Sequence, residues 1–243
     1  MKLIKLNAID STNDFLKALI IKEKVENFTV VTTERQTNGK GQMGSIWETE
    51  EGKNLIMSVF VKDSISGVDE IFNLNVTVAV SIIQALETFK IPQLSIKWPN
   101  DIMSYQFKIG GILIENSLKP DGNVHSVIGL GLNVNQIKFD HLPKASSLSV
   151  ICKKEFDKVA ILQAIIEKIK ENVILLSENP LTIWKTYSGL LFKVGIPMAF
   201  KNSRTHQNFM GIIQGVDSNG QLQVQLVDDS IANYGVKEIQ MLY

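Results

Sequence analysis

A lysine, a tryptophan and a carboxylate stand close together in the segment Lys-Trp-Pro-Asn-Asp at residues 97–101. The apolar residues before this segment predict a short strand, and Pro99 directs a turn after it, so charge is concentrated at a strand end. Lys97 is a candidate to neutralise phosphate, and Asp101 offers the hard oxygen that Mg²⁺ prefers beside nucleotide phosphates. By itself, the segment is also compatible with a plain turn that carries a solvated aspartate.

A second lysine, Lys108, stands at the start of another apolar strand, which we expect at 110–115. Gly110 and Gly111 follow it and permit a ligand to approach the backbone closely. Two lysines at adjacent strand ends predict an anion site. A third apolar segment, Val-Ile-Gly-Leu-Gly-Leu-Asn-Val-Asn at 127–135, leaves space at its glycines, although glycine in a strand can also mark only a bulge or tight packing.

Residues 35–47 form a polar glycine loop, Arg-Gln-Thr-Asn-Gly-Lys-Gly-Gln-Met-Gly-Ser-Ile-Trp, and a strand follows it. A dinucleotide-binding loop opens a helix, and a Walker loop needs Ser or Thr after Gly-Lys, so both common nucleotide interpretations lose support. The glycines still let backbone amides approach an anion, and Lys40 adds charge. We therefore expect a loop that folds over a ligand, with Trp47 as one apolar wall.

The three lysines of these motifs, Lys40, Lys97 and Lys108, gather positive charge without a nucleophile beside them. The chain has neither a His-Glu-x-x-His nor a Gly-x-Ser-x-Gly motif, which disfavours zinc hydrolysis and serine-type acyl transfer. Such a site is suited to catalysis by positioning the reactants, not to covalent catalysis. If a substrate carboxylate attacks the α-phosphate of ATP, the protein must neutralise two anions, align them and stabilise the charge on the leaving pyrophosphate.

Hydrophobic periodicity, caps and breakers predict the elements that position these motifs. The chain should contain helices at 11–24, 69–90 and 155–176, and strands at 3–6, 28–33, 54–61, 94–98, 110–115 and 126–132. Pro180 is expected to end the last helix. The final fifty residues alternate between short apolar segments and glycine turns, which predicts a five-stranded small barrel, joined through residues 177–189 without a helix.

The amino-acid composition limits which partners the protein can bind and in which cellular compartment we expect it. The 243 residues are 44% hydrophobic, and Lys+Arg and Asp+Glu both total 25, so no global field attracts DNA or an anionic membrane. The single cysteine, Cys152, excludes an internal disulfide framework and a Cys-rich zinc cluster. The N-terminus turns polar after six residues and the sequence has no apolar run of about 18 residues, which predicts a cytoplasmic protein.

Taken together, the motifs resemble those of biotin protein ligases, also called biotin--[acetyl-CoA-carboxylase] ligases. The resemblance covers nearly the whole chain and rests on Ser-Thr-Asn at 11–13, Gln36 with the glycine loop, Lys-Trp-Pro-Asn-Asp at 97–101, Lys-x-Gly-Gly-Ile-Leu at 108–113 and Gly-x-Gly-x-Asn at 129–133. It implies an α+β fold. Residues 1–185 would form a mixed β-sheet flanked by helices, similar to class II aminoacyl-tRNA synthetases, and residues 190–243 a Src-homology-3-like β-barrel.

The resemblance also implies roles for individual residues. The catalytic residues would be Lys40, Lys97, Asp101 and Lys108, with Asp101 as the ligand of Mg²⁺. Biotin would be bound by Ser11, Thr12, Asn13, Gln36, Gly39, Trp47, Gly111, Ile112, Leu113 and Gly131. The nucleotide would be bound by Lys40, Gly41, Gln42, Trp98, Asn100, Lys108 and Asn133.

The implied activity is ATP-dependent formation of biotinyl-5'-AMP with release of pyrophosphate, followed by transfer of biotin to a lysine of a biotin carboxyl carrier protein. The protein would be a monomer or a homodimer. Lipoate ligase-like acyl adenylation and non-catalytic binding of biotin or its adenylate are the alternatives.

Gln42 and Ser45 replace arginines that are frequent in the family, so we expect the adenylate to be held less tightly. Because the motifs begin at Ser11, an N-terminal DNA-binding repressor domain is not expected.

Overall fold

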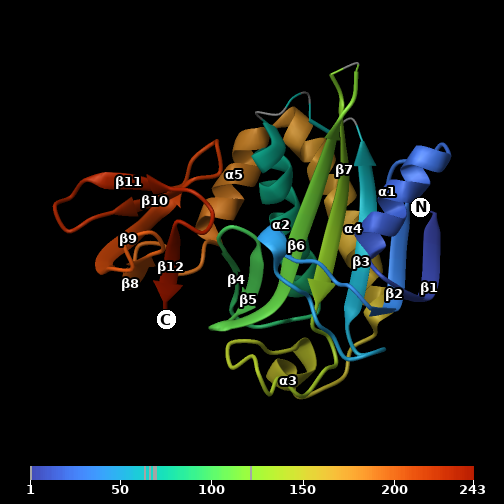
Figure 1. Ribbon diagram of the computed structural model, residues 1–243, viewed down its shortest axis with the longest axis horizontal. Coiled ribbons are helices and arrows are strands. Elements are labelled where there is room, and N and C mark those ends of the chain that lie inside the picture. Colours follow the sequence, from blue (N-terminus) through green and yellow to red (C-terminus); the bar gives the residue numbers. More distant parts are fainter. Residues whose placement is uncertain (1, 63, 66, 68–69, 121) are drawn as a thin grey trace.

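The N-terminal part of the molecule is built on a seven-stranded mixed sheet with the strand order β1-β2-β3-β7-β6-β5-β4 (Figure 1). The structure, a computed structural model, describes residues 2–62, 64–65, 67, 70–120 and 122–243. The strands are β1 Leu3–Ile9, β2 Val30–Gln36, β3 Leu55–Lys62, β4 Leu94–Lys97, β5 Asp101–Ser104, β6 Phe107–Leu118 and β7 Val124–Leu132. Only β1 and β2 pair in parallel, because α1, Thr12–Lys22, crosses between them.

Helices cover both faces of this sheet. Alternate residues of the strands point to opposite faces, so Val30 packs toward α2, Ile71–Thr88, and α4, Lys158–Glu178, whereas its neighbour Val31 packs toward α1. Helix α2 is apolar and long enough to cross a membrane, but 61% of it is buried inside the protein. It corresponds to the helix predicted at 69–90, and its buried residues belong to the largest hydrophobic core cluster. Asp69, the expected start of that helix, lies outside the described residues.

A five-stranded antiparallel sheet follows at the C-terminal end, with the order β11-β10-β9-β8-β12. Its strands are β8 Pro197–Asn202, β9 Asn208–Val216, β10 Leu222–Gln225, β11 Ile231–Tyr234 and β12 Ile239–Leu242. The indole N–H of Trp98 donates to the carbonyl of Gly220 at 2.9 Å, and a Cβ at Gly220 would lie 2.4 Å from the ring of Phe72. Gly220 therefore lets the C-terminal sheet pack closely against the N-terminal part of the molecule.

The predicted fold class is confirmed, but three elements differ from expectation. Residues 180–189 were expected to lack a helix and instead form α5, because Pro180 takes the first turn and Asn179 accepts a hydrogen bond from Thr182 N as its N-cap. The expected turn at 97–101 leads directly into β5, which pairs with both β4 and β6. Helix α3, Leu148–Cys152, was not predicted. The domain limits at 185 and 190 stay a prediction.

Candidate functional site

A cavity of about 750 Å³ lies over the sheet, between the glycine loop and the C-terminal sheet. It brings together most of the residues that the sequence selects. Those that line it are Ser11, Thr12, Asn13, Gln36, Lys40, Gly41, Gln42, Trp47, Lys97, Trp98, Asn100, Asp101, Lys108, Gly111, Ile112, Leu113 and Gly131. The cavity lining does not include Gly39 and Asn133.

One end of the cavity is a polar floor, formed by Ser11, Thr12, Asn13 and Gln36, which line the cavity, and by Ser58, which is buried beneath them. Ser11 caps α1 by accepting from the backbone N–H of Asp14. The backbone N–H of Thr12 donates to Gln36 Oε1 at 2.9 Å, which ties the end of β2 to the start of the helix. The hydroxyl of Ser58 lies 2.7 Å from Thr12 Oγ1 and 2.6 Å from Asn13 Oδ1. The floor is therefore assembled from three separate elements.

Asn13 is a buried member of the polar floor with hydrogen bonds to two strands. Its amide nitrogen donates to Glu115 Oε2 at 2.8 Å and to the carbonyl of Leu113 at 3.3 Å. A Cβ at Gly129 would lie 2.5 Å from Asn13 Oδ1. Gly129 is thus required because the Asn13 side chain lies against the backbone of β7. The space left by this glycine is filled by the protein itself.

The glycine loop closes on itself as a small hairpin. Trp47 N donates to the carbonyl of Gly39 at 2.9 Å, and Gly41 N donates to that of Ser45 at 2.7 Å. A Cβ at Gly39 would lie 2.3 Å from the carbonyl oxygen of Trp47, so this glycine shapes the hairpin and does not face the cavity. A short 3₁₀ helix, η1 Gln42–Gly44, forms the tip.

The indole of Trp47 lies directly on the glycines of the sheet. A Cβ at Gly131 would fall 2.2 Å from Trp47 Cε2, and one at Gly111 would fall 3.3 Å from Cζ3. The space that the family resemblance assigns to biotin at Gly131 is therefore occupied by this ring. Within the described residues, the Trp47 indole N–H is buried without a hydrogen-bond partner. A buried donor of this kind is stabilised by a polar ligand atom.

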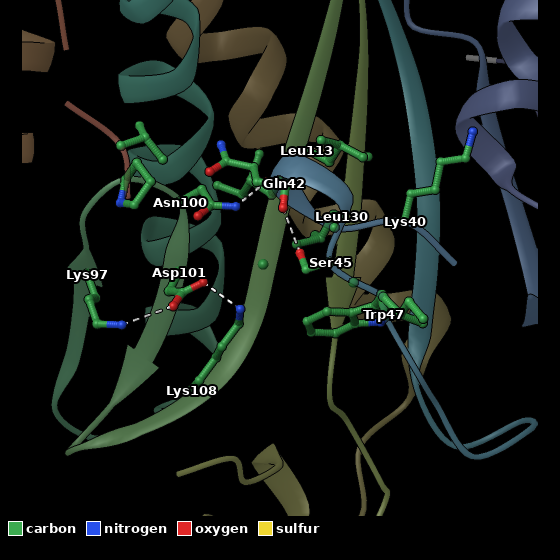
Figure 2. Close-up of a pocket in the computed structure, with 18 of the residues that line it drawn as sticks. Lys40, Gln42, Ser45, Trp47, Lys97, Asn100, Asp101, Lys108, Leu113 and Leu130 are labelled. Carbon is green, nitrogen blue, oxygen red and sulfur yellow. Dashed lines mark hydrogen bonds and ion pairs between the residues drawn. The ribbon is translucent and has the colours of Figure 1, made fainter. Parts of the chain in front are cut away.

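The opposite end of the cavity, the lysine end, consists of Lys97, Asp101 and Lys108. Asp101 lies 2.5 Å from Lys108 Nζ and 3.4 Å from Lys97 Nζ (Figure 2). Antiparallel pairing explains the convergence, because Asp101 is paired with Lys97 on β4 and with Gly111 on β6. The two lysines thus meet at adjacent strand ends, as the sequence predicts. Asp101 is the only side-chain carboxylate among the described residues that line the cavity.

Lys40 does not join the lysine end. Its ammonium lies on the far side of the cavity from Asp101 and forms an ion pair of 2.6 Å with Asp14 of α1 (Figure 2). Asn133 is also displaced from the expected place, since its side chain is buried and donates to the carbonyl of Ser146 at 3.0 Å. It fixes the segment whose backbone pairs with Lys108.

Several residues of the cavity were not predicted. Lys144 lies 4.0 Å from the ring centroid of Tyr243, and Lys237 Nζ donates to the carbonyl of Met43 in the glycine loop at 2.9 Å. Five lysines and one side-chain carboxylate therefore line the cavity in the part of the chain that is described, so the side chains of its lining carry a net positive charge. Ser58 had a detectable signal, because it is a hydroxyl within a strand of apolar residues.

Residues 6–133, more than half of the chain, match the model of the Biotin/lipoate A/B protein ligase family. The chain belongs to this family. The match spans the polar floor, the glycine loop and the lysine end, and so the predicted resemblance is confirmed at the level of the family.

Individual members of the ligase family align along most of the chain. The bifunctional ligase/repressor BirA of Bacillus subtilis is 29% identical over 219 residues, which are 87% of this chain and 64% of that protein. The biotin--[acetyl-CoA-carboxylase] ligase of Mycobacterium tuberculosis is 24% identical over 215 residues, 87% of this chain and 79% of that protein. The biotin protein ligase of Aquifex aeolicus, solved in complex with biotin and ATP, superposes with a TM-score of 0.80 at 23% identity and covers 99% of this chain and 98% of that one. This last likeness supports the fold.

Proposed function

We propose that this protein is an ATP-dependent biotin protein ligase. The observation that carries the proposal is the placement of a buried polar floor and a lysine end in one cavity, beneath a glycine loop. A urea-like group needs several hydrogen-bond partners when it is buried, and an acyl phosphate needs cations. Biotin carries a ureido ring at one end and a carboxylate at the other. It therefore fits a cavity with a polar floor at one end and lysines at the other.

At the polar floor, Ser11, Thr12 and Gln36 hydrogen-bond the ureido ring. Ile112 and Leu113 of β6 border the same cavity and contact the apolar rings and chain of biotin. Trp47 moves off Gly131 when biotin enters, and its indole N–H gains a polar partner. In this way a ring of biotin replaces the indole of Trp47 against Gly131, and the surface of the sheet stays covered.

At the lysine end, the protein aligns two anions. A carboxylate oxygen of biotin attacks the α-phosphorus of ATP, an O–P bond forms, and the bond to the bridging oxygen breaks as pyrophosphate leaves. Lys97 and Lys108 neutralise the carboxylate and the phosphates, and Asn100 and Trp98 border the nucleotide. An acceptor lysine of a biotin carboxyl carrier protein then attacks the acyl carbon, loses a proton and releases AMP.

The residues at this end are compatible with Mg²⁺. Magnesium in nucleotide sites is commonly held by one or two carboxylates together with phosphate oxygens and water, and Asp101 supplies one carboxylate here. Bound there, Mg²⁺ would neutralise charge on the β- and γ-phosphates. The cytoplasm, where ATP and carboxylase carriers occur together, is the compartment we propose.

The decisive experiment is biotin-dependent exchange of pyrophosphate into ATP, followed by transfer to a carrier domain detected with streptavidin. Lipoate in place of biotin should support neither step. The variant Lys108→Ala should reduce exchange by about a hundredfold or more, because it removes a cation from the reacting phosphates. Lys119→Ala is the matched control, since Lys119 follows the other end of β6 and does not line the cavity. Exchange that survives Lys108→Ala in a folded protein would overturn the assignment of Lys108.

A further inference from the structure

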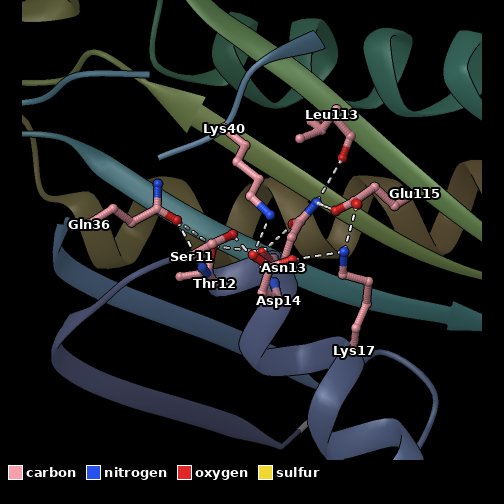
Figure 3. A network of polar contacts seen from close by, with 10 residues as sticks. Ser11, Thr12, Asn13, Asp14, Lys17, Gln36, Lys40, Leu113 and Glu115 are labelled. Carbon is pink, nitrogen blue, oxygen red and sulfur yellow. Dashed lines mark hydrogen bonds and ion pairs between the residues drawn. The ribbon is translucent and has the colours of Figure 1, made fainter. Parts of the chain in front are cut away.

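A chain of polar contacts runs behind the cavity, from the glycine loop along α1 to β6 (Figure 3). Lys40 Nζ lies 2.6 Å from Asp14 Oδ2, and the second oxygen of Asp14 lies 2.8 Å from Lys17 Nζ. Lys17 Nζ in turn lies 2.6 Å from Glu115 Oε1. Asp14 therefore holds two cations at once, one from the glycine loop and one from its own helix.

This chain of contacts returns to the polar floor. The other oxygen of Glu115 accepts from the amide of Asn13 at 2.8 Å, and Asn13 connects through Ser58 and Thr12 to Gln36. Gln36 and Lys40 lie only four residues apart, on the N-terminal arm of the glycine loop. The network therefore begins and ends on the same segment, and it fixes where Lys40 lies relative to the floor.

The ion pair between Lys40 and Asp14 is weak enough for Lys40 to exchange Asp14 for another anion. Both side chains are partly exposed, 44% for Lys40 and 39% for Asp14, and ion pairs with this exposure are weak. Lys40 also lines the cavity, and its flexible stem allows the ammonium to reach another anion. When Lys40 leaves, Lys17 still neutralises Asp14, so no unpaired carboxylate remains.

The charge state of Asp14 fits this role. Partial burial acts to raise the pKa of Asp14, but hydrogen bonds from Lys17 and Lys40 outweigh it, and the pKa lies below its usual value. The side chain is therefore a carboxylate at neutral pH in this arrangement.

We propose that Asp14 is a positioning residue that holds Lys40 against α1 and competes with the phosphate of an acyl adenylate for the same ammonium. The inference rests on the proposed function, because the adenylate is the anion that the reaction forms in this cavity. Its consequence is that Asp14 weakens adenylate binding. The competition helps an enzyme that must pass its adenylate to an acceptor lysine. The ammonium of Lys40 can return to Asp14 during the transfer, so the adenylate is not held too tightly.

The test is a double-mutant cycle on Asp14 and Lys40, measured by titration calorimetry with biotinol-5'-AMP, a stable analogue of the adenylate. Asp14→Asn should tighten binding by about two- to fivefold, the range expected for releasing an exposed ion pair. In a Lys40→Gln background, the same substitution should change nothing. Affinity for biotin methyl ester, which carries no charge, should be unaffected by either substitution.

Asp10→Asn is the matched control for the general loss of negative charge. Asp10 is exposed, lies just before α1 and accepts from the hydroxyl of Thr37 in the loop segment, without a contact to Lys40. It should leave the affinity for biotinol-5'-AMP unchanged. Weaker binding by Asp14→Asn, or the same gain in the Lys40→Gln background, would overturn the role of Asp14. Failure of the unmodified protein to bind biotinol-5'-AMP would instead overturn the proposed function.

Discussion

Most side chains of the polar floor are buried and hydrogen-bonded within the protein, whereas the lysines of the lysine end are partly exposed and share one carboxylate. Ser58 is 0% exposed and Asn13 is 4% exposed, and both have protein partners within hydrogen-bond distance. At the lysine end, the side chain of Lys108 is 36% exposed and that of Lys97 is 23% exposed. The floor is thus fixed by packing, while the lysine end is held by contacts that a stronger anion can replace.

This difference separates two tasks within one cavity. Buried polar networks that are fully bonded have a single arrangement, which suits recognition of a neutral group such as a ureido ring. Partly exposed ion pairs exchange partners at low cost, which suits a site where charge moves during the reaction. If the comparison is correct, changes at the floor should alter stability and biotin binding together. Changes at the lysine end should alter the reaction alone.

The largest effect is expected from Asp101→Asn. The substitution removes the charge shared by two lysines and the one carboxylate proposed for Mg²⁺, so biotin-dependent pyrophosphate exchange should fall by about a hundredfold. Affinity for biotin, measured by calorimetry, should stay within about twofold, because the floor is untouched. Glu34→Gln, which breaks the 2.5 Å ion pair to Lys158 elsewhere on the surface, is the control. A parallel loss of biotin affinity would show that the two ends are not separate.

The second effect is expected from Gly129→Ala. A new Cβ would lie 2.5 Å from Asn13 Oδ1 and would force Asn13 from its place, since the backbone of β7 cannot retreat. We expect a loss of about 1–3 kcal/mol in the free energy of unfolding, the usual range for overpacking, together with a loss of biotin affinity. Gly215→Ala in β9 is the control, because its Cβ would meet nothing closer than 3.8 Å. Equal stability of the two variants in urea titrations would contradict the account of the floor.

The contrast between the two ends also explains what the sequence could predict. Lys97, Asp101 and Lys108 lie on adjacent strands close in sequence, so strand pairing brings them together by local rules. Ser58 lies 46 residues from Thr12, and Glu115 lies 102 residues from Asn13. Contacts at such separation depend on the order of strands in the sheet, which periodicity does not give.

Glycine positions were predictable as special, but their purpose was not. The motif 129–133 indicated space beside a strand, and the structure fills that space with Asn13 at Gly129 and with Trp47 at Gly131. Gly39 shapes the hairpin of the loop, and Asn133 supports the segment before α3. Whether a missing Cβ makes room for a ligand or for a neighbouring side chain is decided by tertiary packing. A single sequence does not contain that information.

A smaller effect is expected from Ser58→Ala, which removes the hydroxyl between Thr12 and Asn13. The loss should be about 1 kcal/mol in the free energy of unfolding, the net contribution of a typical buried hydrogen bond, with weaker biotin binding. Ser126→Ala is a closely matched control. Ser126 is equally buried and donates to Asn116 Oδ1 at 2.7 Å. Asn116 does not line the cavity, whereas Ser58 contacts Thr12 and Asn13, which do, so the Ser126 variant should lose stability without losing biotin affinity. If the two variants bind biotin with the same affinity, Ser58 does not contribute to biotin binding at the polar floor.

The smallest effect concerns the loop that covers both ends. Gln42 lines the cavity and carries no charge, whereas an arginine would offer two parallel donors to a phosphate. Gln42→Arg should slow release of biotinyl-5'-AMP by about two- to fivefold in rapid filtration, because an exposed charge pair adds at most about 1 kcal/mol. Gln42→Met is the control for size, since it keeps the length of the side chain without a charge. If arginine and methionine give the same release rate, retention of the adenylate depends on the fixed lysines and not on the loop.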